Sequence, residues 1–399
     1  MTDTPWLTVL GLGEDGLDGL SPASRQVLER AEVIMGPPRH LSLIPESNAE
    51  RIEWPVPFSD GLPLLSKQTG RRTIVLASGD PFWFGAGSVI ARHFEPGEWT
   101  ALPGQSTFSL AAARLGWPLE GTLTFGLHAA PLTRLRPHLA PSLRAIILLR
   151  NGAAVAELAT YLNETGFADT SLHVMEALGG PRERSQSISL TEALLGSFEH
   201  PVCVGLEVAG TGRAFPKASG KPDDIFETDG QITKRPIRAL TLSALAPQRG
   251  EHLWDIGGGT GSISIEWLMC DATLTATSIE PREDRAERIR RNADTLGQDR
   301  LNVVHGTAPD GLSGLPLPDV VFIGGGLSEE LLVWLQSNLS IGTRLVANAV
   351  TLESEALLAK WQDKLGGELL RIELAQASAL GPRRGWKSAY PVVQWSVTL

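Results

Sequence analysis

The stretch His252–Leu268, HLWDIGGGTGSISIEWL, is the most specific structural signal in the chain. An apolar run ending at Asp255 predicts a buried strand, and a G-x-G-x-G loop and an apolar helix follow it. A dinucleotide-binding loop would need its third glycine at position 262, where this chain has serine. The loop is flat and free of side chains, so it suits a ligand that brings no phosphate to be held.

A strand ending in an acidic residue and followed by G-x-G-x-G is typical of Rossmann-like S-adenosylmethionine (SAM) methyltransferases. The next predicted strand, in LTATSIEPRE, ends at Glu280, whose carboxylate can accept hydrogen bonds from both ribose hydroxyls. Gly259 precedes Glu280 by the usual spacing of about 20 residues. A third strand, in NVVHGTAPDGL, leads into a turn at Ala308, where the adenine edge would lie. The alternative interpretation is a tight strand–helix turn without a ligand.

Short apolar strands alternate with amphipathic helices along the rest of the chain, as in RRTIVLAS followed by GAGSVIARHF. This alternation predicts an α/β protein with mainly parallel sheets. Between Gly210 and Gly230 the composition shifts to Gly, Pro, Ser and charged residues without periodicity. We interpret this segment as a linker plus an ordered lead-in, which predicts two domains, residues 1–212 and 213–399.

A second glycine pattern, G-x-G-x-x-G, spans residues 11–16 in the segment GLGEDG. In a dinucleotide-binding fold the helix begins inside the glycine loop, but here Ser21 and Pro22 predict a later start as N-cap and first helical residue. Glu14 and Asp15 place two carboxylates beside the glycines, where they would repel a pyrophosphate. The pattern therefore does not indicate a nicotinamide or flavin enzyme.

Composition excludes several classes of function. The 399 residues carry a formal net charge of -10, which argues against a nucleic-acid partner held by a general basic field. The two cysteines, Cys203 and Cys270, lack metal-ligand spacing and are interpreted as reduced thiols of a cytoplasmic protein. The N-terminus shows no signal-peptide pattern, no apolar run approaches the ~20 residues of a membrane span, and the histidines are scattered, so no membrane and no metal site are expected.

Residues from about 220 to 399 resemble the precorrin decarboxylating methyltransferase domain of the cobalamin pathway. The matching segments are ITKRPIRALTLSAL, LWDIGGGTGSISIE, IEPREDRAERIRRN, HGTAPDGL, DVVFIGGG and VANAVTLESE. The resemblance implies a class I, Rossmann-like SAM-dependent methyltransferase. It implies SAM contacts by Thr233, Gly257, Gly258, Gly259, Thr260, Gly261, Glu280 and Ala308.

Residues from about 6 to 208 resemble the tetrapyrrole methylase family through GLGEDG, LASGDPFWFGAG, LPGQSTFSLAAARLGWP and HVMEALGGPRERSQSISLTEAL, in that order. The resemblance implies two small α/β subdomains with SAM folded into the cleft between them. Asp80 either binds the SAM amino group or acts only through its Gly-Asp-Pro turn, and Ser106–Thr107 also fits a simple helix cap. The implied cofactor positions are Gly11, Gly13, Gly79, Asp80, Trp83, Ser106 and Thr107.

Together the two halves resemble a bifunctional family of the aerobic cobalamin pathway. The resemblance implies SAM-dependent methylation of the tetrapyrrole precorrin-6B at C5 by the first half. It also implies C15 methylation and loss of the ring C acetate carboxylate by the second half. The substrate's carboxylates need cations, although each candidate could equally be a solvated surface charge. The candidate cations are Lys234, Arg235, Arg238, Arg383, Arg384 and Lys387. Asn348 is a weaker candidate, for an amide contact to the substrate.

Two other functions stay open at this point. The halves could methylate another tetrapyrrole or a small molecule, or they could form a SAM- or nucleotide-binding regulatory module without catalysis. No general acid or base can be named from the residues. A homo-oligomer is expected by analogy with the families that the two halves resemble.

Overall fold

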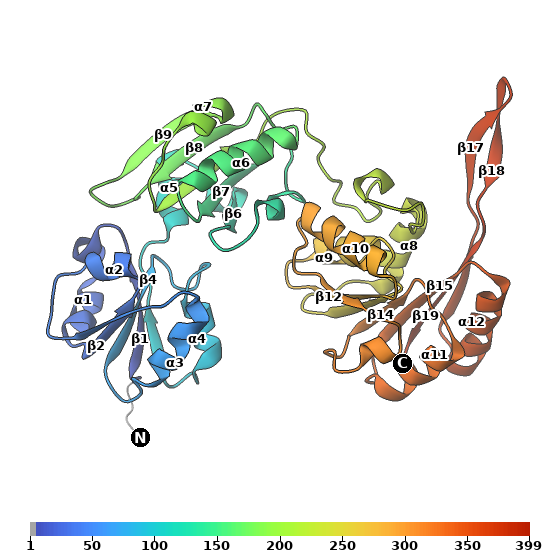
Figure 1. The fold of residues 1–399 in the computed structure, drawn as a ribbon, viewed down its shortest axis with the longest axis horizontal. Helices are drawn as coiled ribbons and strands as arrows, with labels where there is room; N and C mark the ends of the chain where they lie inside the picture. Colours follow the sequence, from blue (N-terminus) through green and yellow to red (C-terminus); the bar gives the residue numbers. More distant parts are fainter. Residues whose placement is uncertain (1–4) are drawn as a thin grey trace. The chain divides into compact units, whose positions relative to one another are not determined.

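A computed structural model describes residues 5–399 and separates the chain into two compact units (Figure 1). Unit 1 contains the residues up to Ala130 and Leu139–Arg213, and unit 2 contains Pro131–His138 and Ala214–Leu399. The junction between Arg213 and Ala214 lies next to the boundary expected at 212/213. The short segment Pro131–His138, however, belongs with unit 2, which the sequence did not indicate.

The first lobe of unit 1 is a five-stranded parallel sheet in the order β3-β2-β4-β1-β5. Residues on both faces of β1 and β4 are buried, which explains their uninterrupted apolar runs. Helix α1 begins at Pro22 with Ser21 capping it, as predicted. The elements are β1 (Leu7–Leu12), α1 (Pro22–Glu29), β2 (Val33–Gly36), α2 (Pro38–Ser42), β3 (Glu50–Glu53), α3 (Gly61–Ser66), β4 (Thr73–Ser78), α4 (Gly87–His93) and β5 (Trp99–Leu102).

The second lobe of unit 1 has a mixed sheet in the order β6-β7-β10-β8-β9. Only β6 and β7 pair in parallel, and the other three pairings are antiparallel. The prediction of mainly parallel sheets is therefore wrong for this lobe. Its elements are α5 (Thr107–Leu115), β6 (Leu123–Gly126), β7 (Arg144–Leu149), α6 (Ala153–Glu164), β8 (Ser171–Glu176), β9 (Arg184–Ser189), α7 (Leu190–Leu195) and β10 (Val202–Glu207).

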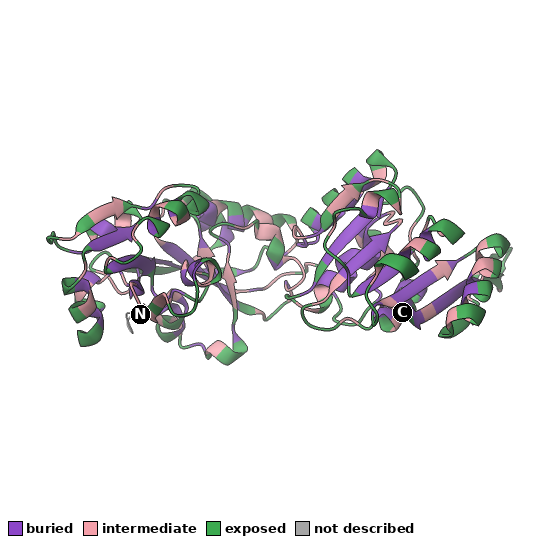
Figure 2. Ribbon diagram, turned by 90° about the horizontal axis from the view of Figure 1, so that it is seen from below, coloured by how far each residue is buried: buried purple, intermediate pink, exposed green. Residues whose placement is uncertain are grey.

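Unit 2 is built on a seven-stranded sheet in the order β13-β12-β11-β14-β15-β19-β16, whose central strands are buried (Figure 2). The first five strands are parallel and form a Rossmann-like order that reverses between β11 and β14, while β19 and β16 add an antiparallel edge. The elements are α8 (Arg235–Leu245), β11 (His252–Ile256), α9 (Ser262–Cys270), β12 (Thr275–Glu280), α10 (Glu283–Thr295), β13 (Asn302–His305), β14 (Val320–Ile323), α11 (Glu329–Asn338), β15 (Arg344–Ala349), α12 (Leu352–Leu365), β16 (Glu368–Ile372) and β19 (Val392–Thr398).

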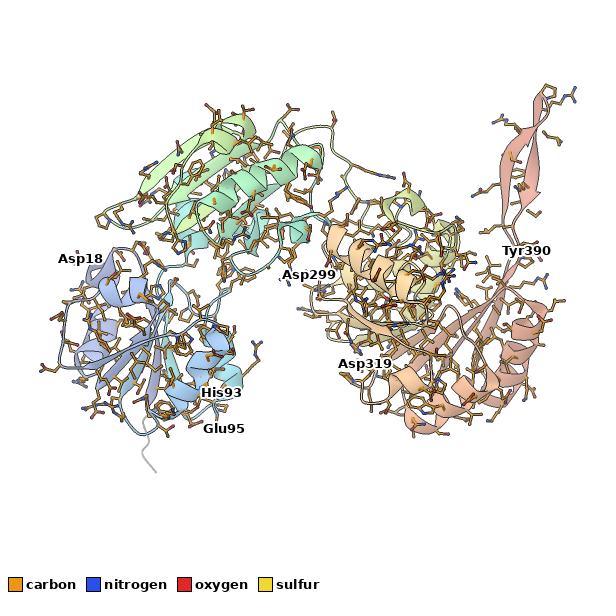
Figure 3. The ribbon with its side chains drawn as sticks, in the orientation of Figure 1. Asp18, His93, Glu95, Asp299, Asp319 and Tyr390 are labelled. Carbon is orange, nitrogen blue, oxygen red and sulfur yellow. The ribbon has the colours of Figure 1, made fainter. Side chains whose placement is uncertain are left out.

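A hairpin of two antiparallel strands, β17 (Ala375–Leu380) and β18 (Arg383–Ser388), extends away from this sheet (Figure 1). The two strands pair only with each other, and Tyr390 lies at the base of the arm (Figure 3). Leu380 and Trp386 are among its exposed apolar side chains. Within residues 5–399, no helix is both long and apolar enough to cross a membrane.

The segment that precedes α8 is folded into unit 2 rather than free. Phe215 and Phe226 belong to the main core of the unit. The backbone N–H groups of Gly220 and Lys221 donate to the buried carboxylate of Glu266 at 2.7 and 2.8 Å. The ordered lead-in expected from the sequence therefore begins close to residue 214.

A fragment of residues 214–399 is expected to fold alone, whereas a fragment of residues 231–399 is expected to be strongly destabilised. The shorter fragment lacks Phe215 and Phe226 and leaves Glu266 without its two backbone donors, and each lost core phenylalanine is worth several kcal/mol. Circular dichroism and chemical denaturation of both fragments measure the difference. Equal stability of the two would show that the lead-in contributes nothing.

Candidate functional site

The pocket of unit 2 lies at the carboxyl ends of its parallel strands. It has a volume of about 580 Å³, within the range of small-molecule sites, and the ends of β11, β12, β14 and β15 line it. The strand order reverses between β11 and β14, and ligands of open α/β sheets bind at such a reversal. The topology therefore places a ligand site where the sequence motif lies.

Backbone hydrogen bonds hold Glu280 at the edge of this pocket. Its Oε2 accepts from the N–H of Gly259 at 2.8 Å, and its Oε1 accepts from the N–H of Arg282 at 3.1 Å. Gly257 has a φ of +74°, and a Cβ there would lie 2.6 Å from the nitrogen of Gly325, so only glycine fits. The result is a fixed carboxylate beside a loop surface that carries few side chains.

Most residues predicted to bind ligands in this half line the pocket, and the others do not. Gly261 is instead the N-cap of α9, with a φ of +74°. Arg235 is exposed at the start of α8 and is absent from the pocket wall. The three cations of the hairpin, Arg383, Arg384 and Lys387, also lie outside it. The lining residues from the predicted set are Thr233, Lys234, Gly257, Gly258, Gly259, Thr260, Glu280, Ala308 and Asn348.

Arg238 requires a correction. Its side chain is fully buried, and its Nε donates to Glu266 at 2.6 Å. The remaining guanidinium nitrogens reach Asp223 and the carbonyl oxygens of Thr233 and Lys221. A guanidinium enclosed in this way has no room for a substrate carboxylate, so Arg238 joins the lead-in to α8 and α9 instead.

Asn348 lines the pocket, but its amide group is also engaged within the protein. It donates through Nδ2 to the hydroxyl of Thr241 at 2.9 Å, and its Oδ1 accepts from Gln394 at 2.9 Å. Such a network fixes the side chain, because each amide end has one assigned partner. A ligand could bond only to the amide N–H and the oxygen lone pair that Thr241 and Gln394 leave free.

Asp255, the last polar residue of β11, is buried, and its carboxylate accepts a hydrogen bond from the hydroxyl of Ser264. Burial raises the pKa of Asp255 to about 6 from its ordinary value of 3.8. The protonated form is thus favoured by folding, and this contribution to stability is present below pH 3.8 and is lost as the pH rises through about 6.

Asp255→Asn is expected to remove this pH dependence, because the amide keeps an acceptor for Ser264 but does not ionise. As the pH rises from roughly 4 to 6.5, the free energy of unfolding of the variant should increase by about 3 kcal/mol relative to that of the wild type. Above that range the difference should stay constant. Denaturant unfolding of unit 2 across this range provides the measurement. A difference that stays constant with pH would contradict the raised pKa.

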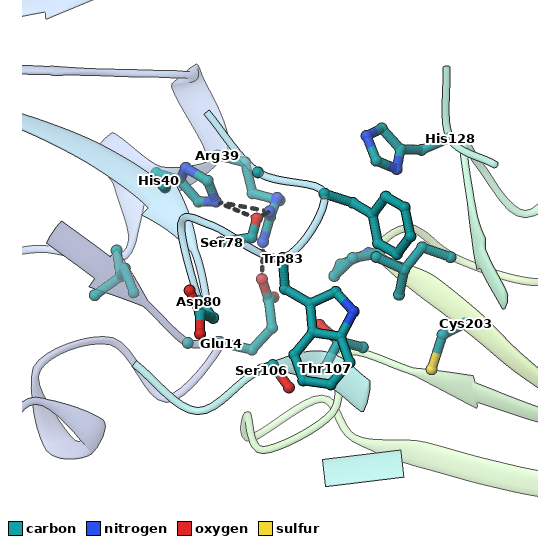
Figure 4. A pocket seen from close by; sticks show the side chains of 18 of the residues that line it. Glu14, Arg39, His40, Ser78, Asp80, Trp83, Ser106, Thr107, His128 and Cys203 are labelled. Atoms are coloured by element: carbon teal, nitrogen blue, oxygen red, sulfur yellow. Dashed lines mark hydrogen bonds and ion pairs between the residues drawn. The ribbon is translucent and has the colours of Figure 1, made fainter. Parts of the chain in front are cut away.

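The pocket of unit 1 lies between its two lobes and has a volume of about 480 Å³. The first lobe supplies the loops that follow the carboxyl ends of β1, β2, β4 and β5, and the second lobe supplies residues of β7, β8 and β10 (Figure 4). Gly13, Gly79, Trp83 and Thr107 of the predicted set line it, as do Asp80 and Ser106. The two-subdomain cleft implied by the resemblance is thus present in the fold.

Three of the residues predicted to bind the cofactor in unit 1 have clear local structural roles. Asp80 Oδ1 accepts from the N–H of Phe82 at 2.8 Å, which closes the turn after β4. Ser106 caps α5 by accepting from the N–H of Ser109 at 3.0 Å. Gly11 does not line the pocket. A Cβ at Gly11 would collide with the backbone of Gly79 and Gly104, so this glycine permits close packing of the neighbouring loops.

The sequence reasoning missed a polar cluster in this pocket, formed by Glu14, Arg39, His40 and Ser78 (Figure 4). Arg39 pairs with the buried carboxylate of Glu14, and its Nη2 donates to His40 Nε2 at 2.8 Å and to Ser78 Oγ at 2.9 Å. Glu14 is therefore not the uncompensated charge assumed above, although the late start of α1 still separates this loop from a dinucleotide fold. The P-P-R-H sequence at the start of α2 offers no periodicity that could reveal the cluster.

Arginine can only donate hydrogen bonds, so His40 Nε2 must accept, and the ring must be neutral with its proton on Nδ1. Burial and the adjacent Arg39 cation lower the pKa of His40 to about 3, in agreement with this assignment.

Trp83 and Phe84 both pack on Phe108, with ring centroids 5.4 and 5.8 Å away, and form an aromatic wall. Opposite the polar cluster, burial raises the pKa of Cys203 to about 12.

Comparison with known proteins assigns a family to each half of the chain. Residues 7–194 match the family of tetrapyrrole (corrin/porphyrin) methylases, and residues 224–399 match the precorrin methyltransferase domain. A precorrin-6Y C(5,15)-methyltransferase [decarboxylating] from Sinorhizobium sp. is 46% identical over 400 residues, covering 99% of this chain and 97% of the relative. One from Mycobacterium tuberculosis is 41% identical, covering 98% and 99%.

Among solved structures, the C-terminal domain of precorrin-6Y C5,15-methyltransferase from Rhodobacter capsulatus is 55% identical. It covers 46% of this chain and 100% of that domain, with a TM-score of 0.45. The two family matches define the chain as a methyltransferase made of a tetrapyrrole methylase module and a precorrin methyltransferase module. The chain belongs to the family of decarboxylating precorrin-6Y C5,15-methyltransferases of cobalamin biosynthesis.

Proposed function

We propose that each pocket binds SAM and that the two pockets divide the reactions of the family between them. The pocket of unit 2 methylates C15 and removes the ring C acetate carboxylate, and the pocket of unit 1 methylates C5. The observation that carries this proposal is Glu280, held by the Gly259 N–H at the edge of a pocket floored by glycines. A fixed carboxylate suits the two ribose hydroxyls, and the glycine loop leaves space for the rest of the ligand.

SAM supplies an activated methyl group when bound. The protein's task is then to hold the macrocycle and the donor in line and to exclude water, and such positioning can contribute about 7–11 kcal/mol to lowering a barrier. The aromatic wall of Trp83 and Phe84 provides a flat apolar surface in unit 1, and Ile237, Leu374 and Val392 provide apolar surface in unit 2. The conjugated substrate can take up the electrons released on decarboxylation, so no further electron sink is required.

Among the cations expected to contact the substrate, Lys234 is supported best, because it is exposed and lines the unit 2 pocket. The hairpin cations Arg383, Arg384 and Lys387 do not line the pocket of their own unit. An isolated two-stranded ribbon is marginal in water, and this one exposes Trp386, which supports the expected homo-oligomer with the hairpin as its contact. The partners proposed are a precorrin-type tetrapyrrole and a second copy of the chain, in the cytoplasm, without nucleic acid or membrane.

The deciding experiment is incubation of the full chain with precorrin-6B and SAM, followed by mass spectrometry of the product. Two added methyl groups and one lost carbon dioxide are expected. Methylation of a different tetrapyrrole, or binding without turnover, would support one of the two alternative functions. Calorimetry with S-adenosylhomocysteine (SAH) should detect two sites, and tight binding of NAD instead would contradict the cofactor assignment.

A further inference from the structure

Arg39 holds an unusual position in the pocket of unit 1. Among the described residues that line this pocket, it is the only lysine or arginine, and therefore the only permanent cation. The other lining side chains that could carry a positive charge are three histidines. His40 is held neutral, and burial lowers the pKa values of His128 and His200. Any anionic group that enters the pocket has Arg39 as its one fixed positive partner.

The ends of three adjacent strands hold the guanidinium in place. Glu14 follows β1, Ser78 ends β4, and His40 stands beside Arg39 in α2 after β2. Together they engage Nη1 and Nη2, and the side chain remains 28% exposed. A partly exposed cation whose rotamer is fixed loses little further entropy when it binds an anion.

Glu14 does not cancel the charge of Arg39 by itself, because a second guanidinium shares the same carboxylate. Arg182 Nη2 lies 3.4 Å from Glu14 Oε2, while Arg39 pairs with Oε1. Arg182 also approaches Glu199 at 3.6 Å, but that carboxylate is 72% exposed and therefore screened by water. Two guanidinium groups thus share the one buried carboxylate of Glu14. The side chain of Arg182 is 56% exposed, so water screens its charge as it screens that of Glu199, and Arg39 is the arginine at the pocket wall.

We infer that Arg39 is the carboxylate-binding residue of the unit 1 pocket and that Glu14, His40 and Ser78 position it. The inference rests on the proposed function of this pocket, which must admit a polycarboxylate macrocycle and a cofactor with its own carboxylate. The bound group is a carboxylate in either case, either an acetate or propionate arm of the macrocycle or the methionine carboxylate of SAM. The carboxylate accepts hydrogen bonds from the guanidinium N–H groups that Glu14, His40 and Ser78 leave free.

The test uses full-length protein with Arg39→Gln, which removes the charge but keeps amide donors. C5 methylation is measured on the C15-methylated, decarboxylated intermediate, and SAH binding to unit 1 is measured in a Glu280→Ala background. A rise of about 10- to 100-fold in KM for the macrocycle, with SAH affinity unchanged, assigns the carboxylate to the substrate. A similar loss of SAH affinity assigns it to the cofactor. If neither KM nor SAH affinity changes, the inference is overturned.

Two further variants separate charge from structure. Arg39→Lys keeps the positive charge, so it should bind the carboxylate more tightly than Arg39→Gln does. It should still bind less tightly than the wild type, because lysine cannot contact Glu14, His40 and Ser78 together. Equal losses of affinity in both variants would overturn a charge-based role. Arg72→Gln replaces an exposed arginine of the same lobe and is the matched control. C15 methylation should be unaffected in every variant that keeps Glu280. Wild-type protein whose unit 1 binds no SAH would refute the proposed function itself, independently of Arg39.

Discussion

Glu280→Ala is expected to weaken SAM binding in unit 2 by roughly one to two orders of magnitude. The substitution removes the proposed ribose contacts and also the acceptor that holds the Gly259 N–H of the glycine loop. A hydrogen bond to a charged acceptor is worth about 1.5–3 kcal/mol, which gives this range. At limiting SAM the variant should lose C15 methylation and decarboxylation together. Supplied with the C15-methylated, decarboxylated intermediate, it should still methylate C5.

SAH calorimetry and product mass measure both halves of this expectation. Glu283→Ala is the matched control, because it removes an exposed carboxylate three residues away that does not line the pocket. Failure on the intermediate with normal C15 methylation would reverse the assignment of the two units. Decarboxylation that persists without C15 methylation would show that carbon dioxide loss depends on a different set of residues.

Arg238→Ala is expected to destabilise unit 2 by about 3–5 kcal/mol, because it leaves the buried carboxylate of Glu266 without its guanidinium partner. The loss should appear as a lower denaturation midpoint of unit 2, with unit 1 unchanged. At temperatures where the variant is folded, its KM for the macrocycle should equal that of the wild type.

Arg235→Ala is the comparison for this variant, since Arg235 lies three residues away on the same helix but is exposed. Its effect on stability should stay within about 0.5 kcal/mol. If Arg238→Ala left stability intact and instead raised KM, the sequence-based assignment of Arg238 to the substrate would be restored.

The features that could be predicted correctly from the sequence are those that depend on neighbouring residues. The glycine loop, the end of β12 at Glu280 and the caps at Ser21 and Ser106 depend on neighbouring residues, and each lies where it was predicted. The pairing direction of β7 and β10 is a tertiary property with no local signature, so the antiparallel lobe was missed. The hairpin β17–β18 is local in sequence, with only Gly381 and Pro382 between its strands, but the residue pattern does not show that its cations lie outside the pocket.

Arg238 and Arg39 show two different limits of reasoning from sequence. Arg238 falls on the buried stripe of α8 with Thr241, Leu242 and Leu245, at helical spacing, and that periodicity could have revealed its burial. Arg39 gives no such signal, because Glu14 and Ser78 lie at the ends of two other strands, β1 and β4, far from Arg39 in the sequence. Only the folded sheet brings those strand ends together.

The buried thiol in the unit 1 pocket bears on how such an enzyme avoids damaging itself. A thiolate is a strong soft nucleophile, and a sulfonium methyl group is a natural target for its attack. Burial raises the pKa of Cys203 to about 12, so the thiol is protonated at pH 7. The other cysteine, Cys270, lies at the end of α9 and does not line the unit 2 pocket. Neither proposed SAM site therefore presents a thiolate to the sulfonium methyl group, because Cys203 is protonated and Cys270 lies outside the pocket lining.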